Sequence, residues 1–255
     1  MRLNPSSFEG TDLTIAEYPK PVLRQTTAAI TAFDNDLQQT AKEMIHVMYQ
    51  AKGVGLAAPQ VNLGLQLFVY NPTGDPLNKN FERVVCNPKI KEYSSETDIE
   101  HEGCLSCRSE ECAGCVCRAC SITVEYHNEL GQKIMRRLKG FEARVFQHEY
   151  DHLQGILCFD RFSPQDKEKS QPMLDTLVQN YGQQDAILDA DPLLLQAIQP
   201  PPLTAGRMPT KLQIQKEQDE VTKKKKEVKA KAGFGSGGFG GGGQNIKSKR
   251  KKKKK

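Results

Sequence analysis

The segment HEYDH, residues 148–152, places two histidines four positions apart, with a glutamate directly after the first. On an α-helix, positions i and i+4 lie one turn apart on the same face, so both imidazoles can direct a ring nitrogen at one ion. Phe141 and Val145 continue this face, and we expect the helix to begin near Gly140 and to end at Gly155. The pattern predicts a helix whose metal-facing side continues into an apolar wall.

Glu149 follows the first histidine and would lie beside such an ion, placed to accept a proton from a bound water. A divalent metal with three protein ligands and one open position lowers the pKa of that water from about 15.7 towards about 7. The segment therefore predicts hydrolysis by a metal-activated water. The alternative is a surface helix that matches HExxH by chance, and a third ligand would decide between the two.

Two cysteines are candidates for the third ligand. In the metzincin pattern a third histidine lies ten residues after the first and follows a glycine; here Gly155 is present, but Cys158 stands at the later position. In EGCLS, residues 102–106, Cys104 follows a glycine and precedes Leu105, whose backbone N–H could face the site. One cysteine and two histidines would suit zinc or ferrous iron and leave a fourth position open.

The rest of the pattern predicts an α+β fold. Apolar residues recur on one helical face from residue 34 to residue 50, with Asp34 as the N-cap and Gly53 just beyond the end. Strand-like runs follow at residues 65–70, 83–86, 121–126 and 132–138, and the last two flank a turn, as in a hairpin. We expect small antiparallel or mixed sheets packed around the central helix that carries HExxH, in a catalytic domain of residues 1–180.

The remaining residues, 181–255, form an extension of different composition. Residues 201–255 carry 17 Lys and Arg against 4 Asp and Glu, whereas residues 1–200 carry 19 against 27. Pro-rich, Gly-rich and Lys-rich stretches leave too few apolar residues for a core, so we expect a disordered tail. Lysines at 223–226 and 251–255 predict binding to the phosphates of nucleic acid without sequence specificity. The alternative is a solvated tail or a localisation signal.

Nothing in the sequence predicts insertion in a membrane or export. No apolar run approaches membrane-spanning length, and the first residues lack the apolar region of a secretory signal, so we expect a soluble, non-secreted protein with no membrane span. Eight cysteines in such a chain favour thiolate chemistry or metal binding over a disulfide framework.

Three segments resemble, in their order and with similar separations, the signature motifs of the peptide deformylase family: GVGLAAPQ (residues 53–60), EGCLS (102–106) and QHEYDHLQG (147–155). The segment YPKPVLR, residues 18–24, is also similar to that family, with Lys20 where an acid is more usual. The similarity runs from about Ile15 to Phe162.

The resemblance implies a hydrolase that removes the N-formyl group from the initiator formyl-methionine of newly made polypeptides and releases formate. It implies one divalent metal ion, Fe²⁺ with Zn²⁺ as the alternative, and these ligands: Cys104, His148 and His152. Glu149 would activate the water and later protonate the leaving amine. The Gln60 side-chain amide and the Leu105 backbone N–H would meet the developing oxyanion.

The resemblance also implies residues around this centre. Val54 and Val145 would line an apolar pocket for the methionine side chain, and Gly55 would let the backbone approach the substrate closely; the two valines could equally be core residues. Glu102 and Arg118 match a pair that braces the strand bearing Cys104, where the alternative is an exposed ion pair of little value.

The chain departs from the family after EGCLS, where residues 107–120 read CRSEECAGCVCRAC. Two C-x-x-C spacings here could hold a second Zn²⁺, and the alternative is a loop of free or oxidisable thiols. Cys107 could also compete for the metal at Cys104 or form a disulfide with it.

The expected partners are N-formylmethionyl nascent peptides and, through the basic tail, the ribosome and its RNA. FVYNPTGDP and the tail resemble the plastid-type branch, so we expect a chloroplast or mitochondrion in a eukaryote and the cytoplasm otherwise. Two other functions remain open on the residues alone. One is an HExxH metalloendopeptidase that uses Cys158 as its third ligand, and the other is a non-catalytic Cys-cluster protein that binds zinc and RNA.

Overall fold

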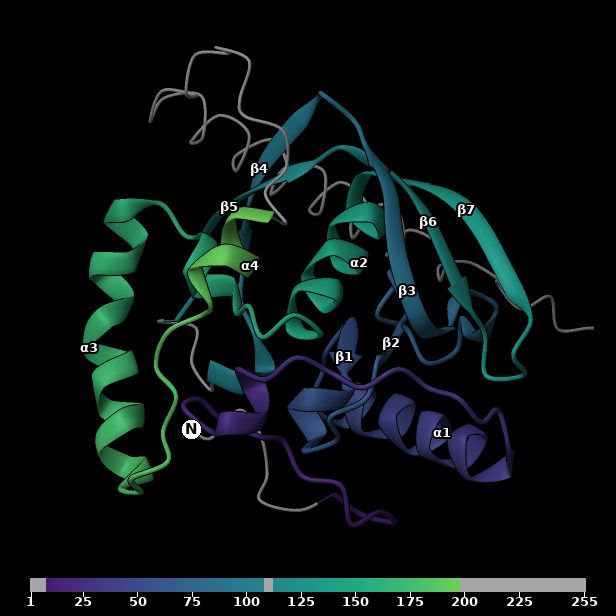
Figure 1. Cartoon of the computed structure of the whole chain (residues 1–255), viewed down its shortest axis with the longest axis horizontal. Coiled ribbons are helices and arrows are strands. Elements are labelled where there is room, and N and C mark those ends of the chain that lie inside the picture. Colours follow the sequence, from purple (N-terminus) through teal and green to yellow (C-terminus); the bar gives the residue numbers. More distant parts are fainter. Residues whose placement is uncertain (1–7, 108–111, 198–255) are drawn as a thin grey trace, which may run out of the picture. The chain divides into compact units, whose positions relative to one another are not determined.

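The computed structural model describes residues 8–107 and 112–197. Its helices are α1 (Asn35–Gln50), α2 (Gly140–His152), α3 (Pro164–Tyr181) and α4 (Pro192–Ala197). Its strands are β1 (Gly55–Ala57), β2 (Leu67–Tyr70), β3 (Arg83–Tyr93), β4 (Thr97–Glu102), β5 (Gly114–Ala119), β6 (Ser121–His127) and β7 (Lys133–Lys139). The predicted α+β fold is confirmed, since α2 lies in the centre with β6 and β7 on one side and β4 and β5 on the other (Figure 1).

Two parts of the sequence prediction lie at the edge of what the structure describes. The tail from residue 198 onward is outside the described residues, so its disorder stays a prediction. The division into residues 1–180 and 181–255 also stays a prediction, although α4 lies within the second range. In the described part of the chain, no helix is long and apolar enough to cross a membrane.

The strands form two antiparallel sheets, one in the order β1-β2-β3-β6-β7 and one that pairs β4 with β5. The predicted hairpin consists of β6 and β7, with Ser121 opposite Lys139 and His127 opposite Lys133. Alternate residues of β6 are buried, as expected for a strand with one face on the core. The sequence did not predict β4 and β5, which read TDIEHE and GCVCRA and lack a run of β-branched or aromatic residues.

Helix α1 forms where it was predicted and supports strand β1. The Leu37 N–H donates to the Asp34 carboxylate at 3.0 Å, which caps the helix. The buried face of α1 packs in one apolar cluster with Leu56, Leu67 and Val69 of strands β1 and β2. This packing fixes β1, and β1 carries Gly55 to the site described below.

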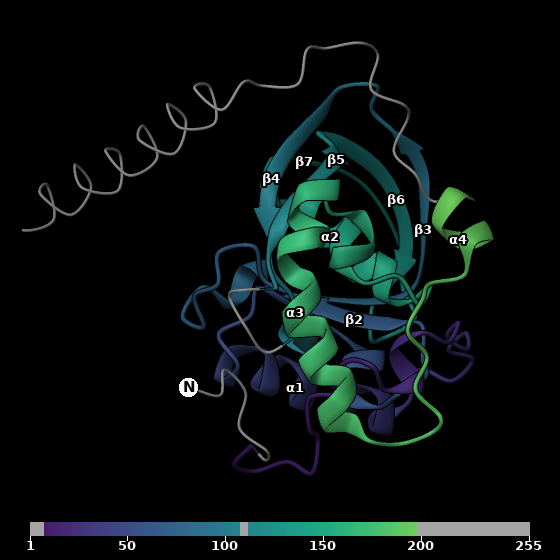
Figure 2. The ribbon, with the colours of Figure 1, turned by 90° about the vertical axis from the view of Figure 1, so that its left-hand side faces the viewer.

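Helix α2 lies between strand β4 on one side and strands β3 and β6 on the other (Figure 2). Its apolar side packs on the larger sheet, where the rings of Phe68 and Phe146 meet edge-to-face at 5.0 Å. Its other buried residues are polar: Arg144, Gln147, Glu149, Asp151 and His152. Phe141, expected on the buried face, is 49% exposed because it lies in the first turn, at the rim of a cavity.

The segment of residues 16–24 runs past the C-terminal end of α2 and ties distant parts of the chain together. Its hydrogen bonds include Ala16 N–H to Gln60 O at 2.7 Å, Tyr18 N–H to Ser106 O at 3.0 Å, and Arg24 Nη1–H to Gly155 O at 3.2 Å. Gly155 has a φ of +70°, and a Cβ there would lie 2.7 Å from the Arg24 carbonyl carbon. Only glycine fits at this crossing.

Helix α3 is anchored to strand β5 by one carboxylate. Ser163 caps the helix by accepting from the Asp166 N–H at 3.2 Å, and Asp166 accepts from the Cys115 N–H at 3.0 Å. Burial would raise the pKa of Asp166, but the hydrogen bonds from Cys115, Lys169 and Ser163 outweigh it and lower the pKa to about 2. The ionised form of Asp166 is therefore more stable relative to its protonated form in the folded chain than in the unfolded chain.

Asp166→Asn is expected to lower the free energy of unfolding at pH 7 by about 1–2 kcal/mol, because the amide cannot replace these charge-assisted bonds. The ordinary pKa is 3.8 and the folded value is about 2, so the difference between the two proteins should shrink as pH falls through this range. Urea unfolding at several pH values measures it. Asp175→Asn, on the exposed face of α3, is the control, and an equal effect of both changes at every pH would contradict the prediction.

Candidate functional site

Cys104, His148 and His152 converge on one point. Their ligand atoms all lie within 4.8 Å of one another, and Cys104 Sγ lies 3.4 Å from His152 Nε2. Two turns of one helix supply the histidines, and the loop after β4 supplies the cysteine. Cys158, the other candidate from the sequence, groups with Cys104 and Cys107 rather than with the histidines.

The donors present fit a divalent metal. One sulfur and two imidazole nitrogens suit zinc or ferrous iron and leave a coordination position open. Glu149 lies beside them, and its Oε2 is buried without a hydrogen-bond partner among the described residues. A buried, unpaired carboxylate oxygen next to three metal-type donors is what a bound ion with its water would satisfy.

Burial changes the proton affinity of Glu149. Its side chain lies in a water-poor environment, which raises the pKa to about 7, although His148 and His152 oppose the shift. Gly55 of strand β1 lies directly against it: a Cβ at this position would come within 2.7 Å of Glu149 Cδ. The glycine thus makes the room that the carboxylate occupies.

Gln60 is oriented towards the cysteine by the 3-10 helix η2 (Ala58–Val61). Its Oε1 accepts from the Ala57 N–H at 2.8 Å, which leaves Nε2 as the end that faces the site. Nε2 lies 3.4 Å from Cys104 Sγ and 3.3 Å from Ser106 Oγ. The amide N–H donors are therefore directed at the place where the metal donors converge.

A buried ionic network holds the histidine side of α2. Glu102 accepts from Arg118 Nε at 2.7 Å and from Arg144 Nη1 at 2.7 Å, and its Oε2 lies 3.0 Å from His148 Nδ1. The Glu102 and Arg118 side chains are 7% and 4% exposed, so this pair is buried rather than on the surface. Burial would raise the pKa of Glu102, but Arg118 and the His148 hydrogen bond hold it well below its usual range.

Sequence reasoning missed three members of this network. Arg118 also binds Asp151 at 2.8 Å, Asp151 binds Arg161 at 2.6 Å, and Arg144 is nearly buried. One signal was available, because positions 144, 148 and 151 share one face of the helix. If this face is buried, the charges of Arg144 and Asp151 each require a partner of opposite charge. The partners on other elements carried no such signal.

A cavity of about 630 Å³ opens beside these groups. Its walls include the residues expected to bind substrate, Val54, Gly55 and Val145, and also Leu105 of the 3-10 helix η4 (Leu105–Cys107). Cys104, His148 and Glu149 lie at its wall as well. The cavity is of a size that takes a small ligand or a few peptide residues.

The cysteines of residues 107–120 separate into two kinds. Cys107 and Cys112 are buried, whereas Cys115, Cys117 and Cys120 are partly exposed on or after β5. Within residues 8–107 and 112–197, no three metal-donor atoms from this segment alone come together. The two C-x-x-C spacings therefore do not by themselves form a zinc site in the described residues, because β5 extends the chain and separates Cys115 and Cys117 from the buried pair.

Known proteins are similar to this chain along most of the described part. Peptide deformylase 1B of Arabidopsis thaliana, chloroplastic or mitochondrial, is 40% identical over 177 residues, which is 69% of this chain and 64% of that protein. Peptide deformylase of Thermotoga sp. (strain RQ2) is 42% identical over 150 residues, 59% of this chain and 87% of that protein. This chain thus spans slightly less than two thirds of the plant protein's length.

A crystal structure of peptide deformylase from Plasmodium falciparum has a TM-score of 0.64 at 36% identity and covers 68% of this chain and 100% of that one. A family model described as polypeptide deformylase matches residues 12–168. Because this match covers more than half of the 255 residues and includes the converging cysteine and histidines, the chain belongs to the polypeptide deformylase family.

Proposed function

We propose that the protein is a metal-dependent hydrolase that removes the N-formyl group from formyl-methionine at the start of new polypeptides and releases formate. One observation carries the proposal: Cys104, His148 and His152 converge within 4.8 Å beside the buried, unpaired Oε2 of Glu149. The cavity at the same place gives the formyl-methionyl end a binding site. Membership of the deformylase family supports the substrate class.

Cys104, His148 and His152 would hold the metal, and we propose Fe²⁺, with Zn²⁺ as the alternative. When bound, the ion supplies a Lewis acid and lowers the pKa of a water ligand. Glu102 accepts from His148 Nδ1, which leaves the other ring nitrogen free to point at the ion. Arg118 keeps Glu102 ionised and so helps to fix this orientation.

Glu149 would move the proton. With a pKa raised to about 7, the carboxylate takes a proton at neutral pH and returns it to the leaving amine. The Gln60 amide and the Leu105 backbone N–H would donate to the oxygen of the formyl group as negative charge develops on it. Val54 and Val145 would enclose the methionine side chain, and Gly55 would let the substrate lie close to β1.

Gly55→Ala is expected to lower turnover by at least about 10²-fold, because a displacement of a catalytic group by roughly 1 Å has this effect. The new Cβ would lie 2.7 Å from Cδ and 2.9 Å from Cγ of Glu149, so the carboxylate must shift. The measurement is kcat for formate release. Gly64→Ala is the control, since nothing lies within 4 Å of a Cβ there. Equal rates in the two variants would show that Glu149 does not depend on Gly55 for its position.

Formate release from formyl-Met-Ala-Ser by anaerobically purified, iron-loaded protein tests the function. Cys104→Ser should abolish metal binding and turnover, whereas Cys158→Ser should retain both, because only Cys104 groups with the histidines. Loss of both properties in Cys158→Ser alone would favour the endopeptidase instead. If the unchanged protein binds the metal but releases no formate, this result would contradict the deformylase function.

The site of action and the partners are also proposals. The relative from Arabidopsis thaliana is described as chloroplastic or mitochondrial, which supports an organelle if this protein is eukaryotic. The basic residues of 201–255 would hold the enzyme near ribosomal RNA by charge. Co-sedimentation with ribosomes should therefore weaken in a version that ends at Pro200, and unchanged co-sedimentation would rule out the tether.

A further inference from the structure

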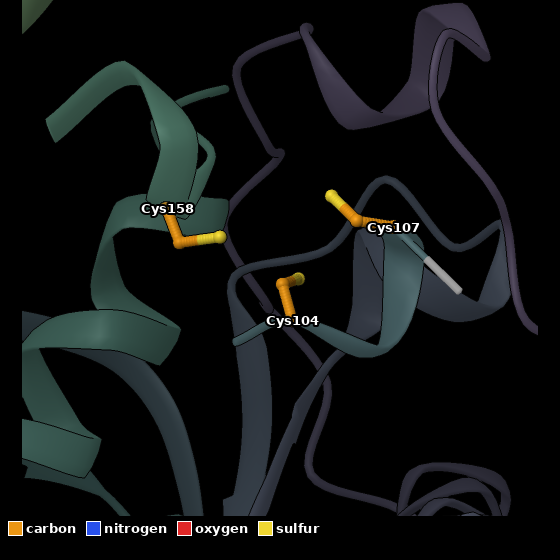
Figure 3. Close-up of side chains that lie close together, drawn as sticks. All are labelled: Cys104, Cys107 and Cys158. Carbon is orange, nitrogen blue, oxygen red and sulfur yellow. The ribbon is translucent and has the colours of Figure 1, made fainter. Parts of the chain in front are cut away.

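Three cysteine sulfurs meet at Cys104, and two of them, those of Cys107 and Cys158, are not among the residues that line the cavity described above. Cys104 precedes η4, Cys107 ends it, and Cys158 begins the 3-10 helix η5 (Cys158–Arg161). Their Sγ atoms all lie within 4.8 Å of one another. The side chains reach towards a common centre from two separate parts of the chain (Figure 3).

We propose that Cys104, Cys107 and Cys158 form a second metal site, made only of thiolates, for a thiophilic divalent ion of the Zn²⁺ and Cd²⁺ class. Two sulfurs bound to one zinc ion at about 2.3 Å lie roughly 3.8–4.0 Å apart, so only a small contraction is required. Cys104 and Cys107 form a C-x-x-C pair closed by the Cys107 N–H, which donates to Cys104 O at 3.1 Å. Such a turn presents two sulfurs on the same side.

The surroundings select the chemistry of the ion. Cys107 and Cys158 are 0% and 2% exposed and belong to an apolar cluster that includes Ala16, Tyr18, Leu23 and Leu157. Among the described residues, no carboxylate joins this group of donors, whereas Mg²⁺ and Ca²⁺ require oxygen ligands, and soft thiolates favour soft ions. A divalent ion leaves one net negative charge on three thiolates, whereas a monovalent ion leaves two, so burial favours the divalent one.

A fourth sulfur is close to this site. Cys112 is buried in the same apolar cluster, and its side chain is hydrogen-bonded with that of Cys107. Zinc in thiolate sites usually takes four ligands in a tetrahedron. We therefore take Cys112 as the candidate for a fourth ligand.

We expect the two metal sites to compete, because Cys104 belongs to both groups of donors and its sulfur would have to bridge two ions for both sites to be filled. On binding, the ion replaces the thiol protons, which pass to solvent. Cys104 Sγ is then coordinated to this ion and no longer serves as a ligand beside the two histidines. An enzyme loaded in this way would lack one ligand of the site proposed above. This last step rests on the proposed role of Cys104, whereas the thiolate site itself does not.

Cadmium binding separates the two sites without any substrate. The full chain with His148→Ala and His152→Ala, kept reduced and free of oxygen, should bind one Cd²⁺ with the ultraviolet charge-transfer bands and the cadmium NMR shift of a sulfur-only site. Adding Cys107→Ala and Cys158→Ala should weaken this binding by more than about 100-fold, since even indirect partners of a metal are worth 10–100-fold. Cys86→Ala, a buried cysteine of a different apolar cluster, is the matched control.

The outcomes decide clearly. Equal cadmium binding with and without Cys107 and Cys158 would overturn the site, and two ions per chain in the otherwise unchanged protein would overturn the competition. Circular dichroism of every variant checks that it is folded. As a second measurement with both histidines present, Cd²⁺ should inhibit the unchanged protein at a lower concentration than Cys107→Ala with Cys158→Ala, each relative to its own rate. Absence of formate release would contradict the deformylase function but would leave the spectroscopic test of this site intact.

Discussion

Glu149→Gln is expected to lower kcat by at least about 10²–10⁴-fold, the usual contribution of a positioned general acid and base, while the metal content stays unchanged. The amide has nearly the same shape as the carboxylate but cannot take up the proton. Glu149 is 4% exposed, and Gly55 leaves room for either group, so we expect no change of fold. Formate release and metal analysis on the same preparation measure both effects.

The pH dependence gives an independent check. A base must be deprotonated, so kcat/KM of the unchanged enzyme should fall as pH drops below the pKa of the essential carboxylate, and the residual activity of Glu149→Gln should lack this acidic limb. Leu130→Gln, an exposed residue of the β6–β7 turn, serves as the control for handling and should behave like the unchanged protein. Full activity in Glu149→Gln would show that another group carries the proton.

Arg118→Leu is expected to lower the free energy of unfolding by about 3–5 kcal/mol, the usual cost of removing one partner of a buried ion pair. Arg118 binds Glu102 and Asp151, and the three side chains are at most 7% exposed. Arg144 still faces Glu102, and Arg161 still faces Asp151, so the value should fall at the lower end of this range. Urea unfolding at pH 7 measures the change.

The sign of the pH dependence follows from the two carboxylates. The pKa values of Glu102 and Asp151 are held below their ordinary values of 4.5 and 3.8, so their contribution to stability is present above those values and is lost as pH falls. The difference between Arg118→Leu and the unchanged protein should therefore shrink in acid. Lys133→Ala removes the exposed pair with Glu125 and should leave the stability nearly unchanged. A similar loss in both variants would contradict the buried network.

Local spacing predicted the parts of the site that share one element. The two histidines and Glu149 follow from helical periodicity, and the structure places Cys104 with them rather than Cys158. The motifs also brought Gln60 and Gly55 to the same centre, but only through the resemblance, since nothing in η2 or β1 alone indicates what they face.

Long-range contacts account for what the sequence did not predict. Arg161 reaches Asp151 from the segment after α2, and Cys158 approaches Cys104 across 54 positions. No periodic pattern records such pairs, because they depend on how β5, α2 and η5 pack together. Strand β5 was missed for a related reason: its small and charged residues are buried by neighbours rather than by their own hydrophobicity.

The crossing of residues 16–24 over Gln60, Ser106 and Gly155 has a consequence for the protein's own biosynthesis. This segment completes its hydrogen bonds only when residues 187 and 188 have been made, because Pro19 O accepts from the Ile187 N–H and Arg24 donates to Leu188 O. Gln60 and Cys104 are made before His148 and His152, so loading of the proposed metal site must wait until the second histidine has been made. An enzyme proposed to act on the first residue of emerging chains would thus gain its own activity only after its catalytic region has been made.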